Sequence, residues 1–112
     1  MDSPLSGVRI WLSGSVPGDA SPMETTRIRT FVEVFAESVF RLGGHIAHGS
    51  HPSLLDPLRT AAERFQSHTG DKAPLGLFVS RLFLKESEPH RFNMSSWNEL
   101  CGDGVEETPE AS

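Results

Sequence analysis

Cysteine is nearly absent from this sequence, and sustained apolar runs are absent altogether. Cys101 is the only cysteine among 112 residues, which excludes an internal disulfide and a multi-cysteine zinc site and fits a reducing compartment. No stretch approaches the roughly 18 apolar residues that a membrane span needs. Asp2, Pro4 and Arg9 interrupt the start of the chain, where a secretory signal would be apolar. We therefore expect a soluble, cytoplasmic protein.

Positive charge is also scarce. Ten Lys and Arg residues stand against fifteen Asp and Glu residues, for a formal net charge of −5 at pH 7. A general binder of nucleic acids or of anionic membranes needs a basic face, so this balance argues against both partners. Much of the acidity lies near the C-terminal end, at Asp103, Glu106, Glu107 and Glu110. We expect residues 101–112 to form an acidic, disordered tail.

The rest of the composition is typical of a globular protein. Hydrophobic residues make up 37% of the chain and charged residues 22%, and seven Phe and two Trp residues can fill a core. The length suits one domain and is too short for two domains with cores of normal depth. We predict a single domain over residues 1–100, with its regular part at residues 7–80.

A strand, a loop and a helix follow one another at the start of this part. Residues 8–12 alternate in polarity as a strand does, and small residues dominate the loop at 13–18. We expect a helix from a cap at Thr25 or Thr26, with its charged side in solvent and an i,i+4 pair between Glu37 and Arg41. Its apolar positions recur every three or four residues: Ile28, Phe31, Val32, Phe35, Val39 and Leu42.

The same order of elements then repeats. Residues 45–48 predict a second strand, residues 49–53 a second loop of small residues, residues 53–67 a second helix, and residues 75–79 a third strand. This alternation predicts an α/β fold: a small Rossmann-like domain of three layers, with a parallel sheet built on a βαβαβ core. Past residue 80 we expect only a short helical segment near Trp97 and Leu100.

The two loops are candidates for a ligand site. Ligands of parallel sheets bind beyond the carboxyl ends of the strands, so residues 13–18 and 49–53 are expected to line one crevice. Small residues at both positions would allow a ligand to approach the backbone N–H groups.

Residues 12–17, 27–29, 49–52 and 54–58 resemble segments of the SLOG superfamily, Rossmann-like domains related to the Lonely Guy and DNA-processing protein families. The resemblance covers residues 7–80 and is strongest to the branch found in bacterial conflict and nucleotide-signalling systems. In that branch, a first strand ends in a segment like Ser-Gly-Ser-x-Pro and a second in a segment like Gly-Gly-His-Pro.

This resemblance implies non-catalytic sensing of a nucleotide or an NAD-derived small molecule, in bacterial antiviral or stress signalling and without a required cofactor. Arg29 would lie near the phosphates of the ligand. Replacing Ser50 or Arg29 with Ala is expected to weaken binding and to leave the unfolding temperature nearly unchanged, because both residues are expected to be exposed. The ligand-binding residues that the resemblance implies are Ser13, Gly14, Ser15, Arg29, Gly49, Ser50, His51 and Pro52.

The sequence also departs from the family pattern. Ser50 stands where a second Gly is expected, and the Pro-Gly-Gly-x-Gly-Thr segment of catalytic phosphoribohydrolases is absent. Little room follows residue 80 for the later strands and helices of the family. The domain is therefore expected to be truncated, with its pocket incomplete or completed by a second copy or another subunit.

Other functions compete with ligand sensing. A hydrolase or transferase acting on a nucleotide N-glycosidic bond would need a positioned carboxylate, for which the loops offer only Asp19 and Asp56. A degenerate domain that only binds partners is a third possibility. The spacing of His45, His48 and His51 suggests a metal site only on a helix, and the surrounding glycines disfavour a helix. We expect no metal there and an inert thiol at Cys101.

Overall fold

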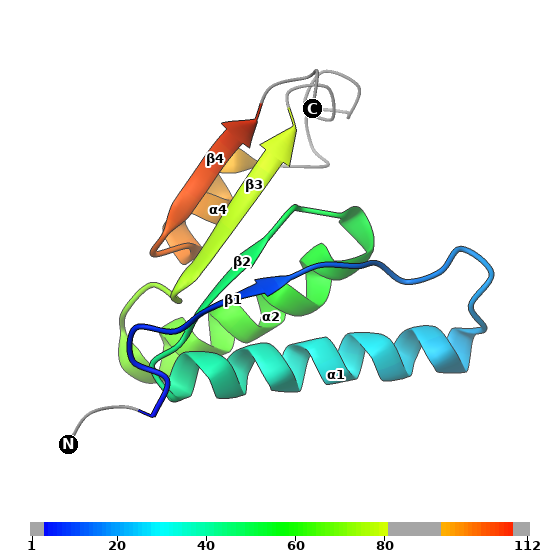
Figure 1. Ribbon diagram of the computed structural model, residues 1–112, viewed down its shortest axis with the longest axis horizontal. Helices are drawn as coiled ribbons and strands as arrows, with labels where there is room; N and C mark the ends of the chain where they lie inside the picture. The colour runs from blue at the N-terminus through cyan, green and yellow to red at the C-terminus, as the bar shows by residue number, and fades with distance from the viewer. Residues whose placement is uncertain (1–3, 81–92, 109–112) are drawn as a thin grey trace.

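Four parallel strands and three helices make up the part of the chain that the structure, a computed structural model, describes: residues 4–80 and 93–108 (Figure 1). The strands are paired in the order of the sequence, β1-β2-β3-β4. In chain order the elements are β1 (Arg9–Leu12), α1 (Pro22–Arg41), β2 (His45–His48), α2 (Pro52–Thr69), β3 (Leu75–Ser80), α4 (Met94–Leu100) and β4 (Gly104–Thr108).

The three helices lie on one face of this sheet. Each strand joins the sheet beside the preceding strand and in the same direction, and right-handed crossovers then place every helix on the same side. Figure 1 shows α2 and α4 behind the strands and α1 below β1. Ile46, Leu75 and Leu77 point into this layer and belong to the core, whereas Trp11 on the opposite face is 57% exposed.

The predicted α/β fold with a parallel sheet built on a βαβαβ core is confirmed. The third layer expected from the sequence is not part of residues 4–80 and 93–108, because every connection in the described chain crosses the same face. The opposite face of the sheet is left open over these residues.

Helix α1 begins earlier than predicted. Ser21 is the N-cap, its Oγ accepts the backbone N–H of Glu24 at 3.1 Å, and Pro22 occupies the first helical position. The expected cap at Thr25 or Thr26 was wrong, since the capping residues precede the apolar pattern. Residues 27–29 therefore lie beyond the first turn of the helix.

The core-facing side of α1 also differs from the prediction. Val32, Ala36, Val39 and Phe40 are buried. Phe31 is 64% exposed and Leu42, just after the helix, is 42% exposed, although both belong to the apolar positions predicted for this helix. The apolar stripe of α1 is thus wider than the surface that the sheet and α2 cover.

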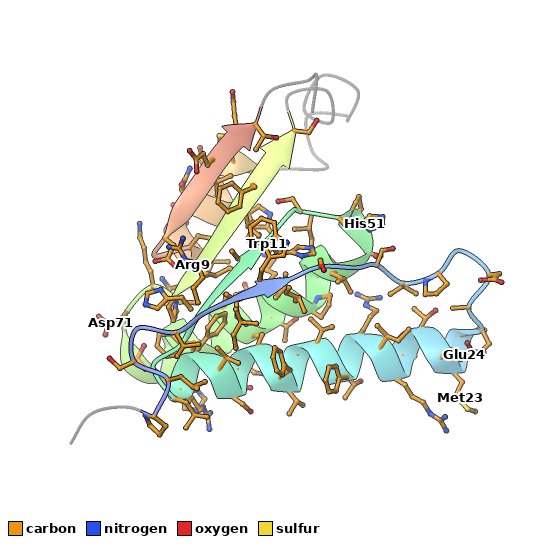
Figure 2. All side chains as sticks on the ribbon, in the orientation of Figure 1. Arg9, Trp11, Met23, Glu24, His51 and Asp71 are labelled. Atoms are coloured by element: carbon orange, nitrogen blue, oxygen red, sulfur yellow. The ribbon has the colours of Figure 1, made fainter. Side chains whose placement is uncertain are left out.

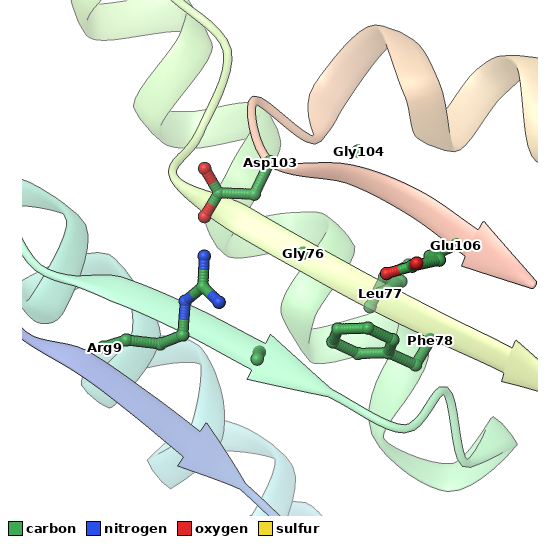
Figure 3. A pocket seen from close by; sticks show the side chains of 8 residues that line it. Arg9, Gly76, Leu77, Phe78, Asp103, Gly104 and Glu106 are labelled. Carbon is green, nitrogen blue, oxygen red and sulfur yellow. The ribbon is translucent and has the colours of Figure 1, made fainter. Parts of the chain in front are cut away.

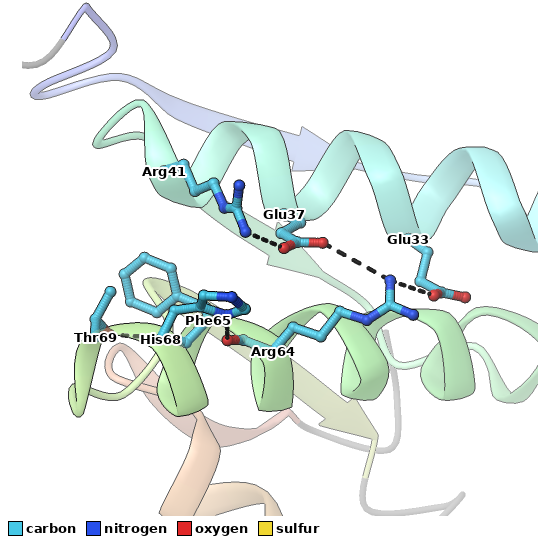
Figure 4. Close-up of polar contacts among 7 residues, drawn as sticks. All are labelled: Glu33, Glu37, Arg41, Arg64, Phe65, His68 and Thr69. Carbon is cyan, nitrogen blue, oxygen red and sulfur yellow. Dashed lines mark hydrogen bonds and ion pairs between the residues drawn. The ribbon is translucent and has the colours of Figure 1, made fainter.

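The charged side of α1 faces α2 rather than solvent alone (Figure 4). The predicted pair is present, with Arg41 Nη2 2.7 Å from Glu37 Oε1. From α2, Arg64 Nη1 lies 2.9 Å from Glu33 Oε1 and 3.8 Å from Glu37 Oε2. Through Arg64, these carboxylates link α1 to α2. The prediction that the charged side of the helix lies in solvent did not include this link.

The segment that follows α4 is ordered, in contrast to the predicted tail. Trp97 and Leu100 of α4 and Cys101 after it are buried in the core. Strand β4 then pairs with β3, in a register from Gly76 opposite Gly104 to Ser80 opposite Thr108. The disordered tail was therefore the wrong prediction for residues 101–108, and residues 109–112 lie outside the described chain.

Candidate ligand site

Two adjacent pockets open at the carboxyl ends of the first three strands. The pocket between β1 and β2 is lined by Trp11, Leu12, Ser13, Gly14, His48, Gly49 and His51. The pocket between β2 and β3 is lined by Gly49, Ser50, His51, Pro52, Val79 and Ser80. The two pockets share Gly49 and His51 in their linings, and we call them together the strand-end crevice.

The structure brings most of the predicted ligand-binding residues to this crevice. Six line it: Ser13, Gly14, Gly49, Ser50, His51 and Pro52. Ser15 and Arg29 do not line either pocket. The convergence of the two loops follows from the parallel pairing of β1 with β2, which ends with Leu12 opposite His48.

Arg29 instead binds α2. Its Nη2 donates a hydrogen bond to Asp56 Oδ2 at 3.0 Å, and both side chains are largely solvent-exposed. The contact joins the middle of α1 to the first turns of α2. The SLOG resemblance implied a position near the phosphates of the ligand for Arg29, and the structure places its guanidinium on Asp56 instead.

Hydrogen bonds through Ser53 connect the two loops. Ser53 Oγ accepts the backbone N–H of Val16 at 3.0 Å and donates to His51 Nδ1 at 2.8 Å. His51 is the N-cap of α2, and its Nδ1 also accepts the backbone N–H of Ser53 at 3.2 Å. The loop after β1 is therefore held against the start of α2.

His48 forms the buried floor of the crevice. It is 2% exposed, and its Nε2 accepts the backbone N–H of His51 at 3.3 Å. With Nε2 accepting, Nδ1 carries the proton and donates to the Leu12 carbonyl oxygen at 2.8 Å. Burial lowers the pKa of His48 below its ordinary value of 6.5. The ring is therefore neutral and joins the end of β1 to the start of α2.

Ser50 is strained and buried, which the sequence reasoning did not anticipate. Its φ of 63° lies in the left-handed region, and no other non-glycine residue of the described chain has a positive φ. The residue is 4% exposed, and its Oγ has no hydrogen-bond partner among the described residues. The expectation of an exposed Ser50 was wrong, because the left-handed turn after β2 leaves the residue buried.

Trp11 and His48 line the crevice but were not predicted as site residues. Trp11 alternates with Ile10 and Leu12, so the strand pattern alone placed its side chain on the face opposite the core. Figure 2 shows Trp11 and His51 near the carboxyl ends of β1 and β2. Trp11 is the next-to-last residue of the strand, and this position was the signal that could have predicted it as a site residue.

A second, smaller pocket lies on the open face of the sheet (Figure 3). Ala47 and Gly76 form its floor, and Arg9, Phe78, Asp103 and Glu106 lie around it. The Phe78 ring is 5.3 Å from that of Trp11, centroid to centroid, so aromatic side chains separate this pocket from the strand-end crevice.

In the described chain, His45 and Cys101 lie apart from the pocket that His48 and His51 share. His45 faces the open side of the sheet, where its Nδ1 lies 2.8 Å from Asp103 Oδ2, whereas His48 is in the floor of the crevice. Burial and the nearby Asp103 carboxylate raise the pKa of Cys101 to about 12, so the thiol stays protonated and unreactive.

The geometry defines a Rossmann-like α/β domain with a crevice at the carboxyl edge of its parallel sheet. No family model, curated protein or solved structure matches the chain. Within residues 4–80 and 93–108, neither α1 nor α2, the two long helices, is apolar enough to cross a membrane.

Proposed function

We propose that the strand-end crevice binds a nucleotide or an NAD-derived small molecule without transforming it, as the resemblance to the SLOG superfamily implies. In this proposal the protein is a ligand sensor of bacterial antiviral or stress signalling and works in the cytoplasm. Six of the eight residues that the resemblance assigns to the ligand line the crevice, which supports the assignment.

The unpartnered hydroxyl of Ser50 is the observation that carries the proposal. A buried polar group without a partner costs about 1–3 kcal/mol, and proteins retain such groups mainly where a ligand or water satisfies them. Ser50 is among the residues that line the crevice beside the N-terminus of α2, where the helix dipole favours a negative charge, and its Oγ is buried there. An anionic oxygen of the ligand, such as that of a phosphate, is the partner that fits both features.

The other pocket of the crevice suits the base of a nucleotide. Trp11 offers an exposed aromatic face for stacking, and Ser13 and Gly14 allow close approach of a planar group to the backbone. The phosphate would then lie between β2 and β3 and the base between β1 and β2.

Binding without chemistry is favoured over hydrolysis of an N-glycosidic bond by the residues that line the crevice. None of the described lining residues is Asp or Glu, and the alternative carboxylate, Asp56, is paired with Arg29 on the surface. A glycosidic bond needs a general acid or a carboxylate that stabilises the sugar cation.

Calorimetry of the purified protein against NAD, ADP-ribose, cyclic ADP-ribose isomers and AMP tests the proposal. We expect at least one of them to bind at a single site, and Ser50→Ala to weaken that binding about tenfold, the loss of one hydrogen bond to a charged group. Ser67→Ala, on the exposed side of α2, is the matched control and should bind normally. Absence of binding by all four, with the fold intact, would overturn the proposal.

Chromatography of the same mixtures separates binding from catalysis. A sensor leaves the ligands intact after long incubation. Release of free base in proportion to protein concentration would instead establish the hydrolase. If none of the four ligands binds and the protein binds a protein partner, the interaction-only domain is favoured.

A further inference from the structure

Helix α1 carries an apolar stripe on the side that faces away from the sheet. Met23, Phe31 and Val34 are 65%, 64% and 58% exposed, and Leu42 continues the stripe just past the helix. These residues recur at the spacing of one helix face, and Phe31 stacks on the partly buried Phe35 at 5.8 Å between ring centroids. Exposed side chains of this size, gathered on one helix, are typical of an interaction surface.

The stripe is not needed for the described fold. The core contacts of α1 are made by Val32, Ala36, Val39 and Phe40, on the opposite side of the helix. The contact with α2 uses Arg29, Glu33 and Glu37, which lie on a third side. Selection for folding alone therefore gives no reason for large apolar side chains at positions 31 and 34.

The stripe matches itself when two copies of α1 run antiparallel about a point midway between Phe31 and Val34. Phe31 of one copy is then level with Val34 of the other, and Met23 with Leu42. Arg27, which lies between them on the stripe, is level with Ser38. Apolar residues thus meet apolar residues at the centre and at both ends of a contact about 28 Å long, the length of 19 residues at 1.5 Å each, with the polar level of Arg27 and Ser38 between them.

Charges at the ends of the stripe agree with the same register. Glu24 is level with Arg41 of the second copy, so each end of the contact brings opposite charges together. Figure 2 shows Met23 and Glu24 together at the N-terminal end of α1. In a parallel arrangement Glu24 would meet Glu24, Arg27 would meet Arg27, and Arg41 would meet Arg41, which is unfavourable at all three levels.

We propose that this stripe is a homodimer interface in which two copies of α1 pack antiparallel. A two-fold interface requires a surface complementary to itself, and the agreement of apolar and charged positions in a single register meets that requirement. A different protein partner would not need this internal symmetry. The inference is independent of the ligand proposed above, because none of its residues lines the strand-end crevice.

Light scattering coupled to size-exclusion chromatography tests the dimer directly. We expect twice the chain mass of 12.3 kDa at micromolar concentrations, and the monomer mass for Phe31→Glu at the same concentration. Thr26→Glu adds the same charge on another side of α1 and should remain dimeric. Circular dichroism of both variants confirms that they are folded. A monomeric wild-type protein, or a dimer that Phe31→Glu leaves unchanged, would overturn the interface.

Charge reversal tests the register. Glu24→Arg and Arg41→Glu should each weaken dimerisation about two- to fivefold, the range of an exposed ion pair, and the double variant should recover it. Recovery in the double variant separates the contact between chains from the pair that Arg41 makes with Glu37 in its own chain.

Disulfide cross-linking tests the direction of the helices. A mixture of Arg27→Cys and Ser38→Cys proteins should form a cross-linked dimer of the two variants, and neither variant alone should cross-link efficiently. The native Cys101 is buried and does not interfere. Efficient cross-linking of Arg27→Cys with itself would show a parallel arrangement and would contradict the proposal.

Discussion

Ser50 combines three unfavourable features in one residue: a left-handed backbone, a buried position and a hydroxyl without a partner among the described residues. Glycine adopts this backbone freely, and the SLOG pattern expects Gly at this position. Serine therefore lowers the stability of the free protein, and its retention is understandable if the hydroxyl contacts a ligand.

Ser50→Gly should raise the free energy of unfolding by about 1 kcal/mol, because the left-handed strain is relieved and the unpartnered hydroxyl is removed. Chemical denaturation of the ligand-free protein measures the change, with Ser67→Ala as the reference for an exposed serine. The same variant should bind the ligand more weakly. A variant that loses stability instead would show that Ser50 is a structural residue.

His48 predicts how stability depends on pH. Its pKa is lowered in the folded protein, so below pH 6.5 the unfolded chain binds a proton that the folded chain does not. The contribution of His48 to stability is complete above pH 6.5. It falls as the pH drops from there towards the folded pKa, by at most about 1.4 kcal/mol per pH unit.

Unfolding measured between pH 7.5 and pH 5 tests this dependence. His48→Gln should be less stable than the wild type at pH 7.5, and its disadvantage should shrink at pH 5. His68→Gln, at the exposed end of α2, should keep the pH profile of the wild type. Parallel profiles for the wild type and His48→Gln would contradict the assignment of a buried neutral ring.

At the scale of elements, the sequence predicted what apolar periodicity encodes. Strands β1 to β3, helix α2 and most of α1 follow the pattern of large side chains, and the crevice follows from their parallel order. The start of α1 was missed because Ser21 caps the helix through its side-chain oxygen and Pro22 occupies the first helical position, and neither residue contributes to an apolar period. Strand β4 was missed because Glu106 and Glu107 make its sequence resemble a solvated tail. In the structure, this segment is ordered by its parallel pairing with β3.

The same limit applies to the site. Small residues at two strand ends predicted the crevice, since parallel strands end at one edge of the sheet. The exposure of Ser50 and the direction of Arg29 depend on a turn and on a contact between helices, neither of which a residue pattern specifies. Trp11 lines the crevice only because β1 ends one residue after it.

The cap of α1 can be tested at this scale. Ser21→Ala removes the acceptor for the Glu24 N–H, and it should lower the free energy of unfolding by about 1 kcal/mol. Thermal unfolding measures the loss. Thr26→Ala, in the exposed interior of the same helix, should change the stability by no more than a few tenths of that value. Equal effects of the two substitutions would place the start of the helix later than Ser21.

At the scale of the whole molecule, the C-terminal segment completes the core. Without α4 and β4, the buried side chains of β3 would face solvent along one side, and Leu75 and Leu77 are almost fully buried. Backbone bonds reinforce this join: Ala73 N–H donates to the Leu100 carbonyl at 2.9 Å, and Gly102 N–H donates to the Ala73 carbonyl at 2.7 Å. The net charge of −5 therefore belongs partly to an ordered edge strand rather than to a tail alone.

Trp97 tests whether this segment and the first three strands unfold together. The ring is 4% exposed in the core, with the Arg59 guanidinium 5.1 Å from its centroid. Trp97→Ala should cost about 3–5 kcal/mol, a large part of the stability of a domain of this size. Because the segment shares one core with β3, we expect a single unfolding transition at lower denaturant concentration. An unchanged main transition, with only a separate early loss of signal, would show that residues 93–108 fold as an appendage and that β1 to β3 are stable without them.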